Sequence, residues 1–367
     1  MVLCNPEGSW PELLPDSELV CEDPLLRAWE WQIRAQIIQA DFLEDDHVVE
    51  PHFQVPWCVD VGDYGVTCLK TQGENRGSYV WDPPIKDIAR DLEKLKYRQP
   101  KVDREETMRR LGIASELFGD ILDVHIGGQY WWTLGLTWTA VDLIGLEELM
   151  WAMVDRPNDL HRLMSWLRDE HEHFILWFEK EGCLTSNCRD QDIASGGIGF
   201  TDQLPVSANG HPAKLSSLWG FAESQETVGV SPEMFAEFVL PYQKPLLEHF
   251  GLNCYGCCEP LHNRWQHVKT LPRLRRVSVS PWCDMEVMAQ ELKRDYIFSR
   301  KPNPALVCVD FNEDNVRADL RHTLDVAGEC VLEIILKDTH TVENQPQRLR
   351  RWVQIAREEI DRHYGNA

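Results

Sequence analysis

The carboxyl-terminal half of the sequence alternates short apolar runs with longer amphipathic segments, and this alternation restricts the possible folds most. Each apolar run ends in a polar or glycine-containing turn, and residues with helical periodicity follow it. Strands that alternate with helices along a chain form a parallel sheet. The runs that we expect to be strands are LNCYGCC (252–258), RRVSVSPWC (275–283), YIFSRKPNPALV (296–307) and VLEIILKDTHT (331–341).

The segments around these runs have the features of helices. Ser231 is the predicted N-cap of a helix over 231–250, with Pro232 at its first position and a kink expected near Pro241; serine followed by proline is typical of a helix start. Upstream, ILDVHIGG (121–128) is predicted to be a buried strand among helical segments. Several such units favour a closed (β/α)8 TIM barrel. An open doubly wound sheet is the alternative, but the sequence has no GxGxxG turn to support it.

The first 80 residues differ from the rest of the chain. Prolines interrupt residues 1–60, although 26–43 has helical periodicity. We therefore expect an irregular, partly helical N-terminal cap over 1–80 and a barrel over 81–367. Together they would form a single domain, because an α/β barrel takes about 250 residues.

Charge and composition exclude several classes of function. The chain has 37 Lys+Arg against 60 Asp+Glu, a formal net charge of −23. Nucleic acids and anionic membranes bind basic surfaces, so neither is an expected partner. With neither a long apolar run nor a secretory start, the chain is expected to be cytoplasmic, and its 12 cysteines to be reduced thiols.

Reactive side chains follow four of the expected strands, where the active site of a barrel lies. They are Glu223 and Glu226; Cys257, Cys258, Glu259 and His262; Cys283 and Asp284; and Lys337, Asp338 and His340.

Cys257 is the strongest candidate among them, because a cysteine among carboxylates and a histidine can be a thiolate ligand of zinc. Catalytic zinc takes Cys, His and Glu/Asp ligands and keeps one position open. We predict Glu223, Cys257 and His340 as the ligands, and Cys258 as a weaker candidate. Each residue also has a structural alternative, which remains open. Both cysteines could be small packed residues, and His340 could be a hydrogen-bonded loop residue. Glu223 could cap a helix or pair with a neighbouring base.

Four segments carry a family resemblance. They resemble the uroporphyrinogen decarboxylase superfamily. The segments are SPEMFAEFVLPYQKPLLEHFGLNCYGCCEPL, RRVSVSPWCDM, SRKPNPALV and EIILKDTHT, the last followed by PQRLRRWVQIARE. The resemblance extends from about residue 80 onward and is strongest over 219–367. It implies a (β/α)8 barrel. It also implies one of two chemistries: metal-free porphyrinogen decarboxylation, or zinc-dependent methyl transfer to or from a corrinoid protein.

The motifs favour the methyltransferase branch of this superfamily. The decarboxylases have an arginine-rich substrate loop near the N-terminus, and this sequence has nothing similar. The methyltransferases carry a His-x-Cys-Gly zinc motif. Here Tyr255 replaces its histidine, Cys257 falls on its cysteine and Cys258 replaces its glycine. The last ligand would lie among residues 338–340.

The resemblance implies an O-demethylase component that depends on cobalamin. Zinc would act as a Lewis acid on the leaving heteroatom, and the methyl group would pass to the Co(I) corrinoid of a partner protein. The 15 tryptophans suit a methoxylated aromatic substrate, and Glu223, Tyr255 and Asp338 are the predicted catalytic residues. Two other hypotheses are a metal-free decarboxylase-like lyase for an acidic aromatic, and a non-catalytic barrel that captures a corrinoid or tetrapyrrole.

Overall fold

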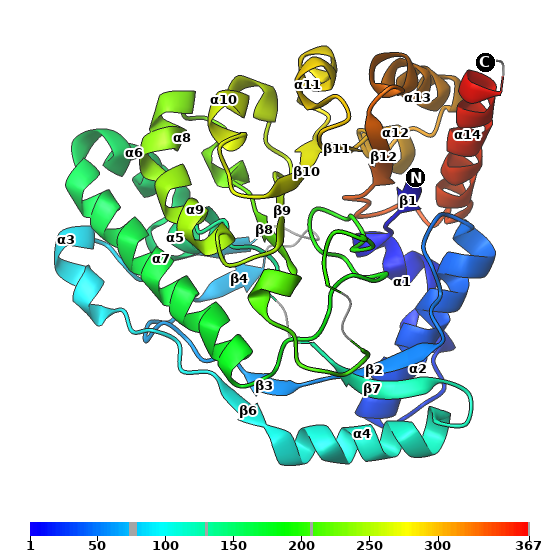
Figure 1. Cartoon of the computed structure of the whole chain (residues 1–367), viewed down its shortest axis with the longest axis horizontal. Coiled ribbons are helices and arrows are strands. Elements are labelled where there is room, and N and C mark those ends of the chain that lie inside the picture. Colours follow the sequence, from blue (N-terminus) through cyan, green and yellow to red (C-terminus); the bar gives the residue numbers. More distant parts are fainter. Residues whose placement is uncertain (73–78, 129–130, 206–207, 366–367) are drawn as a thin grey trace.

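The computed structural model describes residues 1–72, 79–128, 131–205 and 208–365 of an α/β protein (Figure 1). Twelve strands are formed within these ranges. They are β1 Val2–Cys4, β2 His52–Pro56, β3 Cys58–Asp60, β4 Lys70–Gln72, β5 Tyr79–Trp81, β6 Lys101–Asp103, β7 Asp123–Gly127, β8 Trp219–Ala222, β9 Leu252–Tyr255, β10 Leu274–Val279, β11 Ile297–Arg300 and β12 Val331–Leu336.

The main sheet has six parallel strands in the order β1-β12-β11-β10-β9-β8. The strands predicted in the carboxyl-terminal half are therefore confirmed, and they pair in sequence order. The register runs evenly between β10 and β11, where Val277 lies opposite Phe298. Because all six strands are parallel, their carboxyl ends meet at one edge of the sheet.

The closed eight-stranded barrel is seen only in part. Strands β2 and β7 form a separate parallel pair, with Phe53 opposite Val124. Among the described residues no ladder joins β1 to β2 or β7 to β8. The structure thus confirms an α/β fold with a parallel sheet, while continuous barrel closure stays a prediction.

The N-terminus is part of the main sheet as well as of the cap. Strand β1 pairs with β12, Leu3 opposite Ile335, and Asp45 and Asp46 anchor it by accepting hydrogen bonds from the backbone N–H groups of Cys4 and Val2, both at 2.7 Å. Residues 2–7 therefore reach the same sheet edge as the strand ends of the carboxyl-terminal half.

The helices lie around the strands (Figure 1). They are α1 Trp10–Leu13, α2 Pro24–Ile38, α3 Ile88–Asp91, α4 Arg104–Phe118, α5 Thr137–Ile144, α6 Leu146–Asp155, α7 Pro157–Lys180, α8 Pro232–Phe238, α9 Leu240–Leu247, α10 Trp265–Val268, α11 Met285–Leu292, α12 Ala305–Cys308, α13 Glu313–Ala327 and α14 Gln347–Tyr364. Ser231 caps α8 as predicted, accepting from Met234 N–H at 3.2 Å, and the helical path breaks at Val239, two residues before Pro241. Within the described ranges, no helix combines the length and apolar character needed to cross a bilayer.

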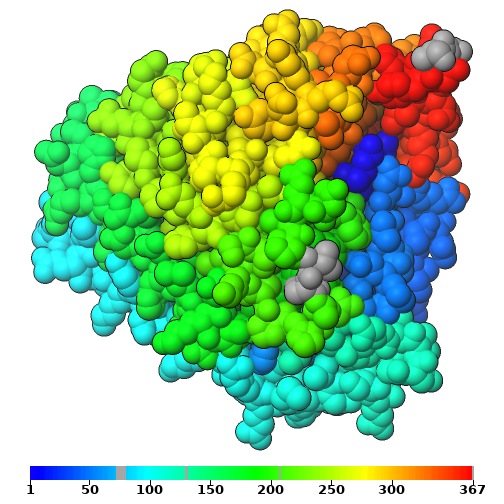
Figure 2. Space-filling model, viewed as in Figure 1, coloured from blue at the N-terminus to red at the C-terminus, as the bar shows by residue number. Residues whose placement is uncertain are grey.

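The segment 183–205 lies against the inner face of the sheet, in the middle of the molecule (Figures 1 and 2). The Asn187 side chain bonds both backbone groups of Trp219 on β8, at 3.0 and 3.1 Å. Gly197 allows the chain to pass Arg276 of β10, because a Cβ there would lie 2.9 Å from the guanidinium. This segment thus covers the inner face of the sheet, and a cluster of polar side chains lies between the segment and the sheet.

Candidate active site

Cys257 lies just beyond β9, in a small polar cluster at the carboxyl ends of the strands. Its Sγ is 3.6 Å from Cys258 Sγ, 3.4 Å from Ser195 Oγ and 4.0 Å from Lys337 Nζ. The hydrogen bond from the Cys258 thiol, together with the charge of Lys337, lowers the pKa of Cys257 and favours its thiolate. Lys337 is also paired with Asp338, at 2.9 Å. We call this cluster the Cys257–Lys337 centre.

Two buried carboxyl groups lie behind this centre. Glu259 accepts from the backbone N–H groups of Ser224 at 2.8 Å and Cys257 at 2.9 Å. Glu223 accepts from Gln225 N–H at 2.9 Å. Burial raises the pKa of both carboxyl groups, and for Glu223 the charges of Glu226 and Glu259 add to it. By accepting these backbone hydrogen bonds, the two carboxyl groups hold the loops after β8 and β9 in place.

The other predicted side chains have partners of their own. Tyr255 is buried, and its hydroxyl donates to Gln243 Oε1 at 2.8 Å. Glu226 accepts from Thr137 Oγ1 at 2.7 Å. Asp284 is the N-cap of α11 and accepts from Val287 N–H at 2.9 Å. The structure thus gives each of these three residues a local hydrogen-bonding role.

The predicted zinc ligands do not converge in the structure. His340 is exposed and lies against Gly8, where an added Cβ would be 3.2 Å from its Nδ1. Within the described residues, no three His, Cys, Asp or Glu side chains are arranged to hold a metal ion. Cys257 has an ammonium group as its neighbour instead. The residues present therefore do not fit the predicted zinc site, and zinc stays a prediction from sequence.

Metal analysis tests that prediction directly. The geometry leads us to expect less than about 0.1 zinc per chain after a chelator wash, since the described residues around Cys257 do not form the group of three or four ligands that zinc requires. Elemental analysis of wild type and Cys257→Ala, with folding checked by circular dichroism, measures it. About one zinc per wild-type chain, lost in the variant, would restore Cys257 as a ligand.

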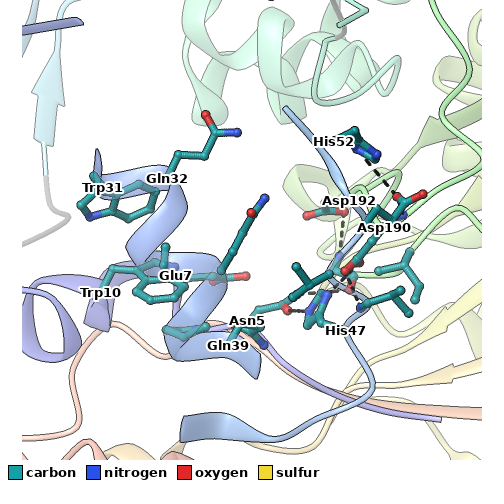
Figure 3. Close-up of a pocket in the computed structure, with 18 residues that line it drawn as sticks. Asn5, Glu7, Trp10, Trp31, Gln32, Gln39, His47, His52, Asp190 and Asp192 are labelled. Carbon is teal, nitrogen blue, oxygen red and sulfur yellow. Dashed lines mark hydrogen bonds and ion pairs between the residues drawn. The ribbon is translucent and has the colours of Figure 1, made fainter. Parts of the chain in front are cut away.

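A cavity of about 510 Å³ lies beside this centre, between the N-terminal segments and residues 190–198 (Figure 3). This volume is in the range of small-molecule sites. Trp10 and Trp31 form one side, with ring centroids 5.5 Å apart in an edge-to-face arrangement. Asp190, Asp192 and His47 lie on the other side (Figure 3).

Asp190 and Asp192 differ in how many of their carboxylate oxygens accept hydrogen bonds within the protein. Asp190 accepts from His47 at 2.9 Å and from Val48 N–H at 2.7 Å, one bond on each oxygen. Among the described residues, the hydrogen bonds of Asp192 go to Oδ1, which accepts from Ala194 N–H at 3.0 Å and Gly196 N–H at 3.3 Å. The second oxygen of Asp192 is thus the acceptor that this wall offers to a ligand.

Glu7 lies in the cavity between the two walls (Figure 3). Its φ of +46° is in the left-handed region, which is unusual for a residue other than glycine and often marks a functional position. Glu7 Oε2 accepts from Asp338 N–H at 2.8 Å, and Asp338 itself has φ +58°. Burial raises the pKa of Glu7, so its carboxyl group can carry a proton at higher pH than an ordinary glutamate.

Ser195 and Gly196 link this cavity to the Cys257–Lys337 centre. Gly196 lines the cavity, and Ser195 contacts Cys257. At Gly196, with φ +84°, an added Cβ would be 3.7 Å from the Lys337 side chain and 2.7 Å from Asn5 Nδ2. Glycine is required here for both backbone conformation and space.

Sequence reasoning missed the residues that form the cavity. Glu7 and Trp10 lie in the part expected to be irregular, Trp31 lies in the helically periodic segment 26–43, and no motif connects them with Asp192. Lys337 and Asp338 were identified as strand-end residues, but their contacts with Cys257 and Glu7 depend on folding.

Comparisons with known proteins bear on the fold. No family model and no curated protein matches this sequence. Among solved structures, the chain is similar to a methyltransferase from Methanosarcina mazei, with a TM-score of 0.52 and 11% sequence identity, over 96% of this chain and 88% of that one. At this identity the similarity shows a shared fold, which extends over nearly the whole chain.

Proposed function

We propose that the protein is a methyltransferase that demethylates a small methoxylated aromatic compound and passes the methyl group to the Co(I) corrinoid of a partner protein. The observation that carries this proposal is the cavity of Figure 3, in which a tryptophan pair faces carboxyl groups at the sheet edge where enzymes of this class of fold act. The fold shared with a methyltransferase supports the reaction class.

The residues of the cavity can perform what the chain must contribute. Trp10 and Trp31 offer ring surfaces for an aromatic ligand. A bound corrinoid would supply the Co(I) nucleophile that takes the methyl group. As the C–O bond breaks, its electron pair stays on the ether oxygen, and Glu7 gives that oxygen a proton. The ether is released as a phenol, the corrinoid of the partner protein would take up the methyl group, and solvent returns the proton to Glu7.

In this proposal the Glu7 carboxyl group, and not the zinc ion predicted from sequence, stabilises the leaving oxygen. The leaving oxygen needs stabilisation in either case, because a phenoxide is a poorer leaving group than a phenol. The raised pKa of Glu7 matches it to this task. Glu223, Tyr255 and Asp338, the catalytic residues predicted from sequence, are then supporting residues; Asp338 positions Glu7 through its N–H group.

The decarboxylase-like alternative receives no support from this cavity. An acidic aromatic substrate needs Lys or Arg side chains for its carboxylate, and none of the residues that line the cavity is Lys or Arg. The carboxylates Glu50, Asp190 and Asp192 would repel it.

An assay with free cob(I)alamin tests the proposal. We expect the protein to convert cob(I)alamin and a methoxylated aromatic into methylcobalamin and the corresponding phenol, detected by the absorbance change of the corrin and by chromatography. Heat-denatured protein and the ether without protein serve as controls. Failure to form methylcobalamin or phenol from neutral, cationic or anionic methoxyarenes would refute the proposed reaction.

A further inference from the structure

We infer that the cavity selects an aromatic methyl ether that carries a positive charge, with its ring at Trp10 and Trp31 and its ammonium group at Asp192. This inference deepens the proposed function and rests on it for the reaction. Binding of the cation can be measured without any methyl transfer.

The charge of the cavity is the first argument. Among the described residues, four carboxyl groups line it, those of Glu7, Glu50, Asp190 and Asp192, and the basic side chains in this lining are His47 and His52. The Lys337 ammonium group outside the lining offsets part of this negative charge, because it acts on Glu7 and Asp192. His47 is held by Asp190, and Arg189 Nη1 lies 3.4 Å from His52 Nε2. An ammonium ligand is attracted to such a lining, whereas a carboxylate ligand is repelled.

The free oxygen of Asp192 is the second argument. Its partner oxygen is fixed by two backbone N–H groups, so the carboxylate is held in place before any ligand binds. The side chain is exposed to the cavity. Hydrogen bonds between a charged donor and a carboxylate are among the strong ones in proteins. A preorganised acceptor in this position therefore favours a primary ammonium group.

The aromatic side of the cavity is an independent feature that points to the same ligand. Trp31 is 36% exposed although its neighbour Trp10 packs against it, so its ring surface is available. Aromatic faces attract flat rings, and they also attract cations. Glu7 lies between the tryptophans and Asp192 (Figure 3), which places the proton donor between ring and ammonium sites.

Three para-substituted methoxybenzenes of similar size and different charge test the inference: 4-methoxybenzylamine, 4-methoxybenzyl alcohol and 4-methoxybenzoate. We expect isothermal titration calorimetry at pH 7 to show that the amine binds at least about tenfold more tightly than the alcohol, as one charge-assisted hydrogen bond provides. The benzoate should bind more weakly than both. Equal affinities, or tightest binding of the benzoate, would overturn the inference.

Asp192→Asn is the decisive variant, because asparagine keeps the Oδ1 acceptor for Ala194 and Gly196 and removes the charge. We expect the amine to lose its about tenfold advantage while the alcohol binds as before. Asp310→Asn, at an exposed position outside the cavity, controls for net charge and should keep the preference. An unchanged preference in Asp192→Asn would refute the assignment.

A second variant covers the case in which Asp192→Asn does not fold. Trp31→Ala, at a partly exposed ring, should weaken the amine and the alcohol equally, because both stack through the same ring. The inference and the proposed function fail separately. Selective amine binding without methylcobalamin formation would refute the reaction alone. Turnover of the benzoate without amine selectivity would refute the cation site alone.

Discussion

Glu7→Gln is expected to lower the rate of methyl transfer from a methoxylated aromatic by about 10²–10⁴-fold, the usual contribution of a general acid. Glutamine can still accept the hydrogen bond from Asp338 N–H, so the cavity should keep its shape and the ligand its affinity. The cob(I)alamin assay measures the rate, and calorimetry measures the affinity. A loss of binding equal to the loss of rate would contradict a role in proton transfer.

The pH dependence separates a proton donor from a structural residue. Glu7 acts in its protonated form, and burial raises its pKa. The rate should therefore be full below this pKa and fall as pH rises through it. Glu7→Gln should lack this fall. Glu18→Gln, an exposed glutamate of the same N-terminal segment, should keep both the rate and the profile of the wild type.

Glu333→Gln is expected to lower the free energy of unfolding by about 3–5 kcal/mol, the cost of leaving a buried charge without its partner. Glu333 of β12 is 2% exposed, and Arg276 of β10 is 4% exposed. They form an ion pair inside the sheet at 2.8 Å. Ser299 donates to the same carboxylate, and Lys301 bonds Ser299 in turn. Without Glu333, the two buried cations would face each other uncompensated.

Urea denaturation followed by circular dichroism measures this effect, and two further variants define it. Glu181→Gln breaks the exposed pair with Arg104, at 3.0 Å, and should cost no more than about 1 kcal/mol. The double variant Arg276→Met/Glu333→Leu removes both charges and should recover most of the loss. A loss below about 1 kcal/mol for Glu333→Gln would show that water or relaxation satisfies Arg276.

The main sheet could be predicted from local sequence because its strands carry their own signals. β9 to β12 are apolar runs bounded by turns, and Ser231–Pro232 marks a helix start wherever it occurs. The N-terminal strands β1 and β2 were not predicted. They are only three and five residues long, and prolines lie close to them, so their pairing with β12 and β7 depends on partners distant in the sequence.

Only the residues of the candidate site that lie at the end of a single strand could be predicted from sequence. Cys257 was identified correctly as a residue at the sheet edge, because the end of a parallel strand defines that edge. Its neighbours Ser195 and Lys337 come from segments 62 and 80 residues away. The lysine beside the thiol, and the exposed position of His340 against Gly8, distinguish this geometry from the zinc site expected from sequence.

The sequence by itself determined the alternation of strands and helices, the helix starts and the acidic charge, because hydrophobic periodicity and capping act between residues close in the chain. The tertiary structure alone decided the cavity. Glu7 and Trp31 reach Asp192 only because β1 docks on β12 and the segment 183–205 folds into the sheet. Contacts between residues so far apart arise from packing, which no local pattern encodes.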